Sequence, residues 1–483
     1  MRQPLPAMDA GWLMLETPET PAHVGAMAIL SKPPQAGPDY LQQLVARLRE
    51  PVTVVSPWNR RLRQGPLARW LPSWEEDPHI DLDYHFRHSA LPQPGGEREL
   101  GVLVSRLHSH PLDMTRPLWE LHLIEGLAGD RFALYCKVHH SVIDGVGGMR
   151  LTARVLSESP EDPRFVHPWA VGPLPGARKP KSAAVNPKLS VAVAGEVARA
   201  FGKLCSAALE PDNPLAAPFA APRSVLGLHI NAQRRFATQQ YDLARVRRLA
   251  RVAGCTLNDM VMYLSATALR RFLAELGQLP SQALTSGIAV NLREADDHSA
   301  GNAISFMIVS LATDIADPIE RLRAIQRSSE ASKAHLKSLS RPALLPYTVL
   351  SGMPYALTLL TGLAPYVRPP SSVNISNVPG PERHVYFAGA RVEAVYPMSM
   401  LFHGCALNIT CVSYAGTLNF GFTGARDTLP RLQRLAVYMG EALEEIAAVL
   451  EPPAASVAGT QVAKAAKKRD GGARPRRARR KKE

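Results

Sequence analysis

The strongest constraint on the fold is a short segment with two histidines, an aspartate and a glycine, His139-His140-Ser141-Val142-Ile143-Asp144-Gly145. Residues 132–138, just before it, are rich in apolar and β-branched side chains and predict a strand, whereas residues 144–157 carry apolar side chains at helical spacing. Asp144 can serve as the N-cap of that helix, and Gly145 lets the backbone come close to a bound molecule. The segment therefore predicts a strand-to-helix turn that presents one histidine to a cleft.

The two histidines are adjacent, which limits what they can do together. Neighbouring residues on an extended chain point to opposite faces, so His139 and His140 are not expected to reach the same ligand. A metal site is therefore not predicted here, and the chain has no H-E-x-x-H, C-x-x-C or G-x-x-x-x-G-K-[ST] motif. Two interpretations stay open: a pair of hydrogen-bonded core histidines, or one histidine acting as a general base with a nearby carboxylate holding the turn or the ring.

No side chain in the sequence offers itself as a partner nucleophile. The G-x-S-x-G motif is absent, and Ser141 lies too close along the chain to face the histidines. The cysteines have an odd count and no paired spacing, so we expect reduced, mostly buried thiols of a cytoplasmic protein. They are Cys136, Cys205, Cys255, Cys405 and Cys411. The remaining option is that the base activates a substrate hydroxyl, which attacks a second substrate directly.

The motif resembles the H-H-x-x-x-D-G signature of the CoA-dependent acyltransferase superfamily, and other blocks narrow the resemblance. Over residues 3–450 the chain is similar to the bacterial wax ester synthase/acyl-CoA:diacylglycerol acyltransferase family, whose blocks occur here in the family order. The blocks are Met8-Asp9 to Glu16, Pro21 to Gly25, Trp74 to Pro78, Asp81 to His85, Pro111 to Asp113, Arg116 to Glu120, Thr256 to Asp259, Asn377 to Pro381 and Ser413 to Gly416. One block departs from the family pattern: Ala289-Val290-Asn291-Leu292-Arg293 stands where Pro-Val-Ser-x-Arg is common.

The resemblance implies an α/β fold with two chloramphenicol-acetyltransferase-like domains, mixed sheets with flanking helices, that share a central tunnel. Length also favours two domains, and a Pro- and Ala-rich stretch marks a linker between them. We expect an N-terminal acyltransferase domain over 1–167, a linker with a bridging helix over 168–225, a C-terminal domain over 226–452 and a disordered basic tail over 453–483.

The resemblance also implies a reaction. A neutral His140 would take the proton from a fatty alcohol or diacylglycerol hydroxyl as it attacks an acyl-CoA thioester, while His139 orients or packs. Asn258 is a candidate oxyanion donor, and it could instead, or also, cap the following helix. Asp144 is expected to hold the turn, with Arg293 as a possible charged partner.

Substrate contacts are expected at Glu16 and at the block formed by Asn377, Val378, Pro379, Gly380 and Pro381. No cofactor is expected, because acyl-CoA is a substrate. The chain is expected to be a monomer or homodimer.

Two segments bear on lipid contact. Residues 342–367 carry no charge but contain several prolines and glycines, so we expect buried or interfacial helices that line the acyl tunnel rather than a membrane span. Residues 464–483 carry +9 of the formal +14, with no aromatic residues to stack bases. We expect this tail to bind an anionic lipid surface or only to aid solubility, and no specific nucleic acid. With no visible secretory signal, the expected location is cytoplasmic, peripherally on the inner membrane or on lipid inclusions.

Two other functions stay open at this point. One is a different branch of the superfamily that uses another acceptor or a carrier-bound acyl donor. The other is a non-catalytic protein that binds lipid droplets. The intact His140, Asp144 and Gly145 disfavour the second, and the absence of carrier domains disfavours the first.

Overall fold

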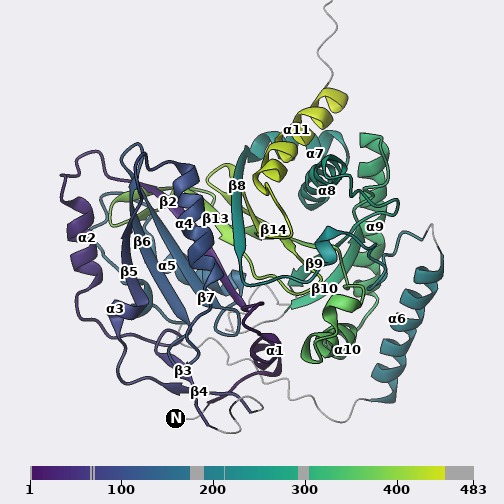
Figure 1. Cartoon of the computed structure of the whole chain (residues 1–483), viewed down its shortest axis with the longest axis horizontal. Coiled ribbons are helices and arrows are strands. Elements are labelled where there is room, and N and C mark those ends of the chain that lie inside the picture. Colours follow the sequence, from purple (N-terminus) through teal and green to yellow (C-terminus); the bar gives the residue numbers. More distant parts are fainter. Residues whose placement is uncertain are drawn as a thin grey trace, which may run out of the picture.

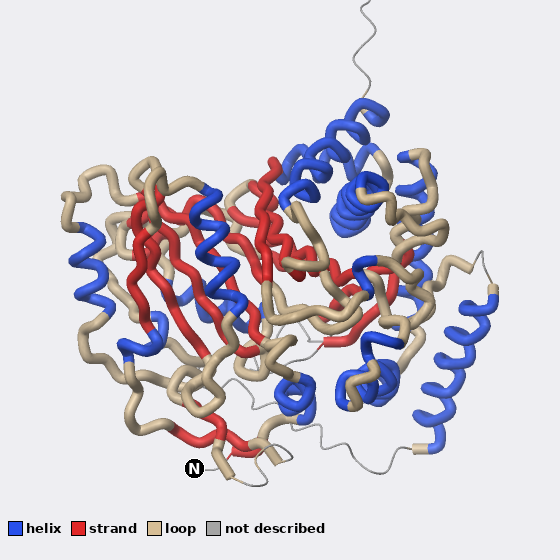
Figure 2. The backbone as a smooth tube through the Cα atoms, in the orientation of Figure 1, coloured by secondary structure: helices blue, strands red, loops and turns tan. Residues whose placement is uncertain are grey.

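Two six-stranded mixed sheets lie side by side, each with helices packed on it (Figure 1). The computed structural model describes residues 3–65, 68, 71–173, 190–210, 213–291 and 304–451. Figure 2 shows the strands gathered in the middle of the molecule, with most helices on the outside. A third, small sheet has the order β1-β4-β3. Its strands are β1 (Gln3–Pro4), β3 (Arg60–Leu62) and β4 (Ser73–Glu76).

The first sheet has the order β12-β13-β2-β7-β6-β5. Its strands are β2 (His23–Ser31), β5 (Phe86–Ala90), β6 (Trp119–Leu127), β7 (Arg131–His139), β12 (Tyr386–Phe387) and β13 (Ala390–Met398). The helices of this half are α1 (Ala7–Leu15), α2 (Tyr40–Leu48), α3 (Leu82–His85), α4 (Glu97–Ser109), α5 (Gly145–Val155) and η1 (Pro168–Ala170). Strand β7 lies between β2 and β6, inside the sheet. It pairs antiparallel with β2, and its last residue, His139, lies opposite His23.

The second sheet has the order β10-β9-β11-β14-β15-β8, in which β11 runs parallel to both of its neighbours. Its strands are β8 (Arg234–Asp242), β9 (Thr285–Asn291), β10 (Ile304–Ser310), β11 (Val373–Pro379), β14 (Leu407–Tyr414) and β15 (Thr417–Ala425). The helices are α6 (Val191–Leu209), η2 (Val225–Gly227), α7 (Leu243–Val252), α8 (Leu257–Glu275), α9 (Pro318–Lys337), α10 (Arg341–Leu360), η3 (Ala364–Tyr366) and α11 (Gln433–Leu450). Helix α8 is mostly buried because α7, α9 and α11 all contact it.

The second half of the chain contributes a strand to the first sheet. Strand β13 lies late in the chain, yet it pairs with β2 of the first sheet, from Arg391 opposite Ser31 to Met398 opposite Gly25. It also contacts β14 and β15 of the second sheet, so it forms the seam between the halves. The sequence assigned residues 226–452 to one domain, and it gave no sign that residues 386–398 cross over. The domain boundaries themselves stay a prediction.

Helix α4 closes the edge of the second sheet. The Ser109 hydroxyl accepts the N–H of Arg234 at 2.8 Å, and the Ser105 hydroxyl accepts the N–H of Phe236 at 3.0 Å. These donors belong to β8, the last strand of its sheet. Two side chains of the first half therefore satisfy backbone groups that an edge strand would otherwise leave exposed.

The charge-free segment forms helices, as expected: α10 ends at Leu360, and the short η3 follows it. Pro346 and Pro354 do not interrupt the first of them, because both lie inside α10. Within the described ranges, α10 is also the one helix long and apolar enough to cross a membrane, and 22% of its most apolar 18-residue window is buried. The basic tail and residues 174–189, 211 and 212 of the predicted linker lie outside the described residues, and the rest of the linker contains the helix α6.

The seam between the sheets leaves no room for a side chain at Gly421 of β15. A Cβ placed there would lie 1.9 Å from the carbonyl oxygen of Pro397 on β13, which is backbone and cannot turn aside. We expect Gly421→Ala to lower the free energy of unfolding by about 1–3 kcal/mol or more, measured by urea titration.

Gly202→Ala is the matched control, because a Cβ at this helical position in α6 meets nothing within 4 Å. Alanine favours a helix by about 0.5–1 kcal/mol over glycine, so this variant is expected to be neutral or stabilising. Equal effects of the two substitutions would contradict the close approach at the seam.

Candidate active site

His139 is the last residue of β7, and its ring is fully buried in a hydrogen-bonded cluster. Its Nδ1 accepts the backbone N–H of Ser141 at 3.1 Å and lies 2.6 Å from the Ser141 hydroxyl, so the expectation that Ser141 would not face the histidines is wrong for His139. Because Nδ1 is an acceptor, Nε2 carries the proton of the neutral ring and donates it to the Glu16 carboxylate at 3.0 Å. The other Glu16 oxygen accepts the N–H of Ala22 at 3.2 Å. His139 therefore ties the end of β7 to the segment between α1 and β2.

His140 faces a different environment. Its backbone N–H donates to the Ala22 carbonyl at 2.9 Å, and its ring lies on the wall of a cavity. The Trp12 ring is 4.6 Å away between centroids, and the Phe402 ring in turn stacks on Trp12 with centroids 6.1 Å apart. Burial, with a smaller contribution from His139, lowers the pKa of His140 to about 4. The ring is therefore neutral near pH 7 and can accept a proton.

The two adjacent histidines thus have separate surroundings, as strand geometry predicted. His139 contacts buried polar groups, and His140 contacts the cavity.

Asp144 is the N-cap of α5, as expected from the sequence. Its side chain accepts the N–H of Gly147 at 2.7 Å, and the helix begins at Gly145. The carboxylate is 5% exposed, so the cap is a buried one. The possible partner Arg293 lies outside the described residues.

Asn258 does not cap α8, and this part of the expectation is wrong. The N-cap is Thr256, whose hydroxyl accepts the N–H of Asp259 at 3.2 Å, while the Asp259 carboxylate accepts the N–H of Thr256 at 3.0 Å. This reciprocal pair satisfies two helix-end donors at once. Asn258 instead accepts a hydrogen bond from the Asn377 side chain at 2.8 Å, which joins two predicted site residues.

The block from Asn377 to Pro381 lies against the start of α5. A Cβ on Gly145 would lie 3.9 Å from Val378, an ordinary contact distance. A Cβ on Gly380 would meet the Ser413 carbonyl oxygen at 2.5 Å and Met149 at 3.3 Å. The block therefore packs the second sheet onto the helix that follows the histidines, and glycine is required at position 380.

The cavity beside His140 has a volume of about 310 Å³ and lies between the halves. Its wall combines α1, α6, β9, β10, α9, α10, β11 and the loop before β14. Most of its lining is apolar, including Leu15, Leu204, Ala289, Phe306, Met307, Ile308, Leu336, Ala356, Leu359, Met400 and Phe402. A few polar side chains interrupt this lining, among them Asn374, Ser376 and Asn408. A largely apolar wall with few polar groups is typical of a site for an apolar ligand.

The predicted site residues do not all lie on the cavity wall, and some instead hold the neighbouring elements together. Of the predicted residues, His140 lies on the cavity wall. Glu16, predicted to contact substrate, binds His139 instead, because its buried carboxylate needs hydrogen-bond donors. The block at 377–381 packs against α5 and β14 rather than lining the cavity.

Trp12, Asn374 and Ser376 were missed. Asn374 and Ser376 both lie on β11, just before Asn377. Side chains two positions apart on a strand point to the same face, and this polar pair could have been found from that alternation.

Two family models match the chain. The model described as the wax ester synthase/diacylglycerol acyltransferase catalytic domain matches residues 5–261, and that described as the WS/DGAT C-terminal domain matches residues 300–447. Together they cover all of the first sheet and all strands of the second sheet except β9.

Individual proteins give the same result. A protein named as a diacylglycerol O-acyltransferase in Mycobacterium tuberculosis is 43% identical over 482 residues, which cover 91% of this chain and 96% of the relative. The O-acyltransferase WSD of Acinetobacter baylyi is 36% identical over 454 residues, with 92% and 96% covered. The solved wax ester synthase/diacylglycerol acyltransferase of Marinobacter aquaeolei superposes with a TM-score of 0.75 at 37% identity, covering 93% of this chain and 99% of that one. The fold implied by the sequence resemblance is thereby confirmed.

Proposed function

The chain belongs to the wax ester synthase/diacylglycerol acyltransferase family and is an O-acyltransferase, and from this premise we propose how it works. It moves a long-chain acyl group from acyl-CoA to a fatty alcohol or to diacylglycerol, with His140 as the general base. The observation that carries the proposal is the neutral His140 ring on the wall of an apolar cavity, backed by a buried Glu16–His139 pair.

The proposed reaction is a direct transfer. The His140 ring takes the proton of the acceptor hydroxyl as its oxygen attacks the thioester carbonyl, which gives a tetrahedral oxyanion. The C–S bond then breaks, the ester forms, and the protonated ring returns its proton to the CoA thiolate. No cofactor takes part, because donor and acceptor supply all the atoms that move.

The oxyanion needs a hydrogen-bond donor, and loss of such a donor typically costs about 2.7–4 kcal/mol of transition-state stabilisation. Asn258 is less suited to this role than the sequence indicated, because it is exposed and does not line the cavity that holds His140. The Ser376 hydroxyl on the cavity wall is the better candidate, since it lies in the same cavity as His140.

His140→Ala tests this function directly. With palmitoyl-CoA and either hexadecanol or dipalmitoylglycerol, wild-type protein is expected to release CoA, measured as free thiol. Loss of the general base is expected to lower that rate about 10²–10⁴-fold. The thermal midpoint should change little, because the ring lies on a cavity rather than in the packed core.

His139→Ala is the matched comparison at the neighbouring position. It removes the partner of a buried carboxylate, and a buried charged group left unpaired costs about 1–3 kcal/mol or more of stability. This variant is therefore expected to lose thermal stability as well as activity. Turnover by His140→Ala within a few-fold of wild type would reject the assignment, and absence of CoA release with both acceptors would reject the proposed substrates.

The pH profile provides an independent readout. A general base works only when neutral, so lowering its pKa extends activity to lower pH. With a pKa of about 4 for His140, kcat/KM is expected to stay level from pH 8 to about pH 5 and to fall only below that range. Circular dichroism at each pH separates protonation from acid unfolding. A fall centred near the ordinary histidine value of about 6.5 would contradict the burial effect.

We further propose that the protein works at a lipid surface and that α10 is the docking element. One face of α10 lines the cavity through Tyr347, Tyr355 and Leu359. The opposite face and the segment after it are exposed and apolar, at Val349, Leu350, Met353, Leu357, Leu360, Leu363, Tyr366 and Val367. A contiguous exposed apolar face is unfavourable in water and fits the interfacial region of a membrane or lipid inclusion.

Charge on this face tests the docking proposal. The double variant Met353→Glu/Leu357→Glu replaces two side chains that are 53% and 59% exposed and do not line the cavity. Because burying each such side chain is worth about 1 kcal/mol or more, we expect binding to fall at least tenfold. The measurement is co-sedimentation with phosphatidylcholine vesicles containing diacylglycerol.

Val102→Glu on α4 is the control, since Val102 is equally exposed at 66% but lies on another helix. Equal vesicle binding by both variants and the wild type would exclude α10 as the docking element.

A further inference from the structure

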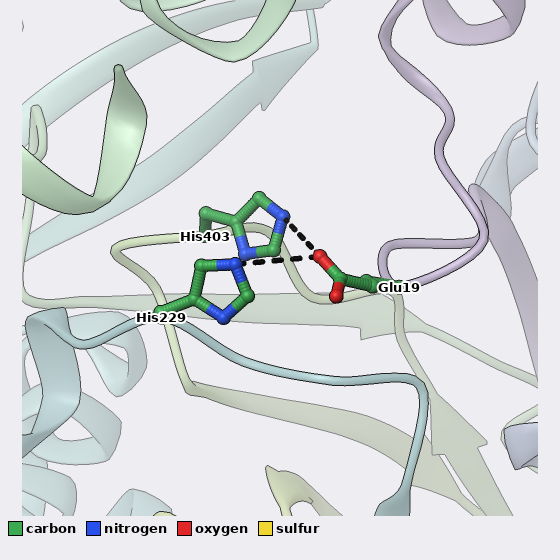
Figure 3. A group of neighbouring side chains, drawn as sticks. All are labelled: Glu19, His229 and His403. Carbon is green, nitrogen blue, oxygen red and sulfur yellow. Dashed lines mark ion pairs between the residues drawn. The ribbon is translucent and has the colours of Figure 1, made fainter. Parts of the chain in front are cut away.

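Three side chains from distant parts of the chain meet away from the cavity lining, and Figure 3 shows them converging. One Glu19 carboxylate oxygen lies 3.2 Å from Nε2 of His403 and 3.3 Å from Nε2 of His229. Glu19 belongs to the segment between α1 and β2, His229 precedes β8, and His403 lies in the loop between β13 and β14. Their possible ligand atoms all lie within 4.8 Å of one another.

We propose that Glu19, His229 and His403 form a binding site for a divalent transition metal, with zinc as the ion that fits best. Two imidazoles and one carboxylate are a ligand set that zinc uses, at bond lengths of about 2.0–2.2 Å. Tetrahedral ligands at such lengths stand about 3.4 Å apart. The separations of 3.2 and 3.3 Å already match this spacing, so the carboxylate needs little movement.

The site is partly open to solvent. The Glu19 and His229 side chains are 48% and 52% exposed, whereas His403 is 10% exposed. A metal can therefore enter from solvent and keep water as a fourth ligand. His403 would serve as the fixed ligand, and the other two as the adjustable ones.

One ring must turn for the metal to bind. The two imidazoles are stacked, with centroids 4.2 Å apart and planes at 25°, whereas a metal lies close to the plane of each ring it binds. Exposed His229 can rotate about its side-chain bonds at low cost. His403 must also change tautomer, because its Nδ1 accepts the Ile230 N–H over a long 3.4 Å and its Nε2 therefore carries the ring proton. A metal on Nε2 moves that proton to Nδ1 and breaks the weak bond from Ile230, so the metal bonds must outweigh this loss.

The charges near the site favour binding that is reversible. Arg234 opposes a cation, because it donates a hydrogen bond to the backbone carbonyl of Glu19 and adds positive charge nearby. The Glu19 carboxylate attracts the cation and the Arg234 guanidinium repels it. We therefore expect an ion that exchanges with solvent rather than one that stays permanently bound.

Binding there would join three segments that surround the active site. The Glu19 segment also holds Glu16, the partner of His139, and His403 follows Phe402, which stacks on Trp12. A metal would therefore stabilise the folded protein, and the thermal midpoint would rise with its concentration.

The test uses full-length protein freed of metal by a chelator and then titrated with zinc chloride. We expect calorimetry to detect one site, thermal unfolding to shift upward, and cobalt(II) in place of zinc to show visible absorption. His229→Ala and Glu19→Gln are expected to weaken this binding at least tenfold. Both residues are half exposed, so these variants are expected to fold.

His79→Ala is the matched control, since this histidine is exposed on the first half and outside the cluster. It separates the proposed site from adventitious binding to surface histidines. No zinc binding by the wild type, or equal binding by His229→Ala, would overturn the proposal. Neither outcome bears on the acyl transfer assay, because none of the three ligands lines the cavity.

Discussion

The hydrogen bond between the Glu16 carboxylate and the His139 ring holds the turn that carries His140, and both groups are nearly inaccessible to water. A carboxylate in such surroundings is stable only with donors, so the segment after α1 cannot leave the end of β7 without a large penalty. Helix α1, which leads into this segment, places Trp12 against His140, and the Ala22 carbonyl of the segment accepts the His140 N–H. One buried pair thus determines which histidine faces the cavity. It also accounts for the different surroundings of the two adjacent histidines.

The halves of the molecule depend on each other in a comparable way. Strand β13 completes the first sheet although it comes from the second half of the chain, and the serines of α4 satisfy the edge of the second sheet. The cavity is built from both halves, with His140 on one and β9, β10 and β11 on the other. A cut between the predicted domains would therefore leave an unpaired strand in one piece and an open site in the other. Separate folding of the two halves is not expected from this arrangement.

Local features were predictable from the sequence, and long-range ones were not. Strand β7, helix α2 and the Asp144 cap follow from hydrophobic period and capping chemistry, which act over a few residues. The partner of His139 is 123 positions away, and no local pattern marks Glu16 as its acceptor. Asn258 was misjudged as a possible cap because Thr256 and Asp259 form a closed pair around it. The crossing of β13 and the meeting of Glu19 with His229 and His403 depend on tertiary packing alone.

The position of helix α10 has a consequence for the rate at which the ester product leaves the enzyme. An ester product is longer and less polar than either substrate, and moving a hydrocarbon chain into water costs roughly 0.8 kcal/mol per methylene. With the cavity on one side of α10 and an apolar exterior on the other, the proposed docking of α10 would give the product a short path into a hydrocarbon phase. Turnover would then be set by how readily that phase absorbs the ester. In aqueous dispersion without such a phase, departure of the product rather than proton transfer would limit the steady-state rate.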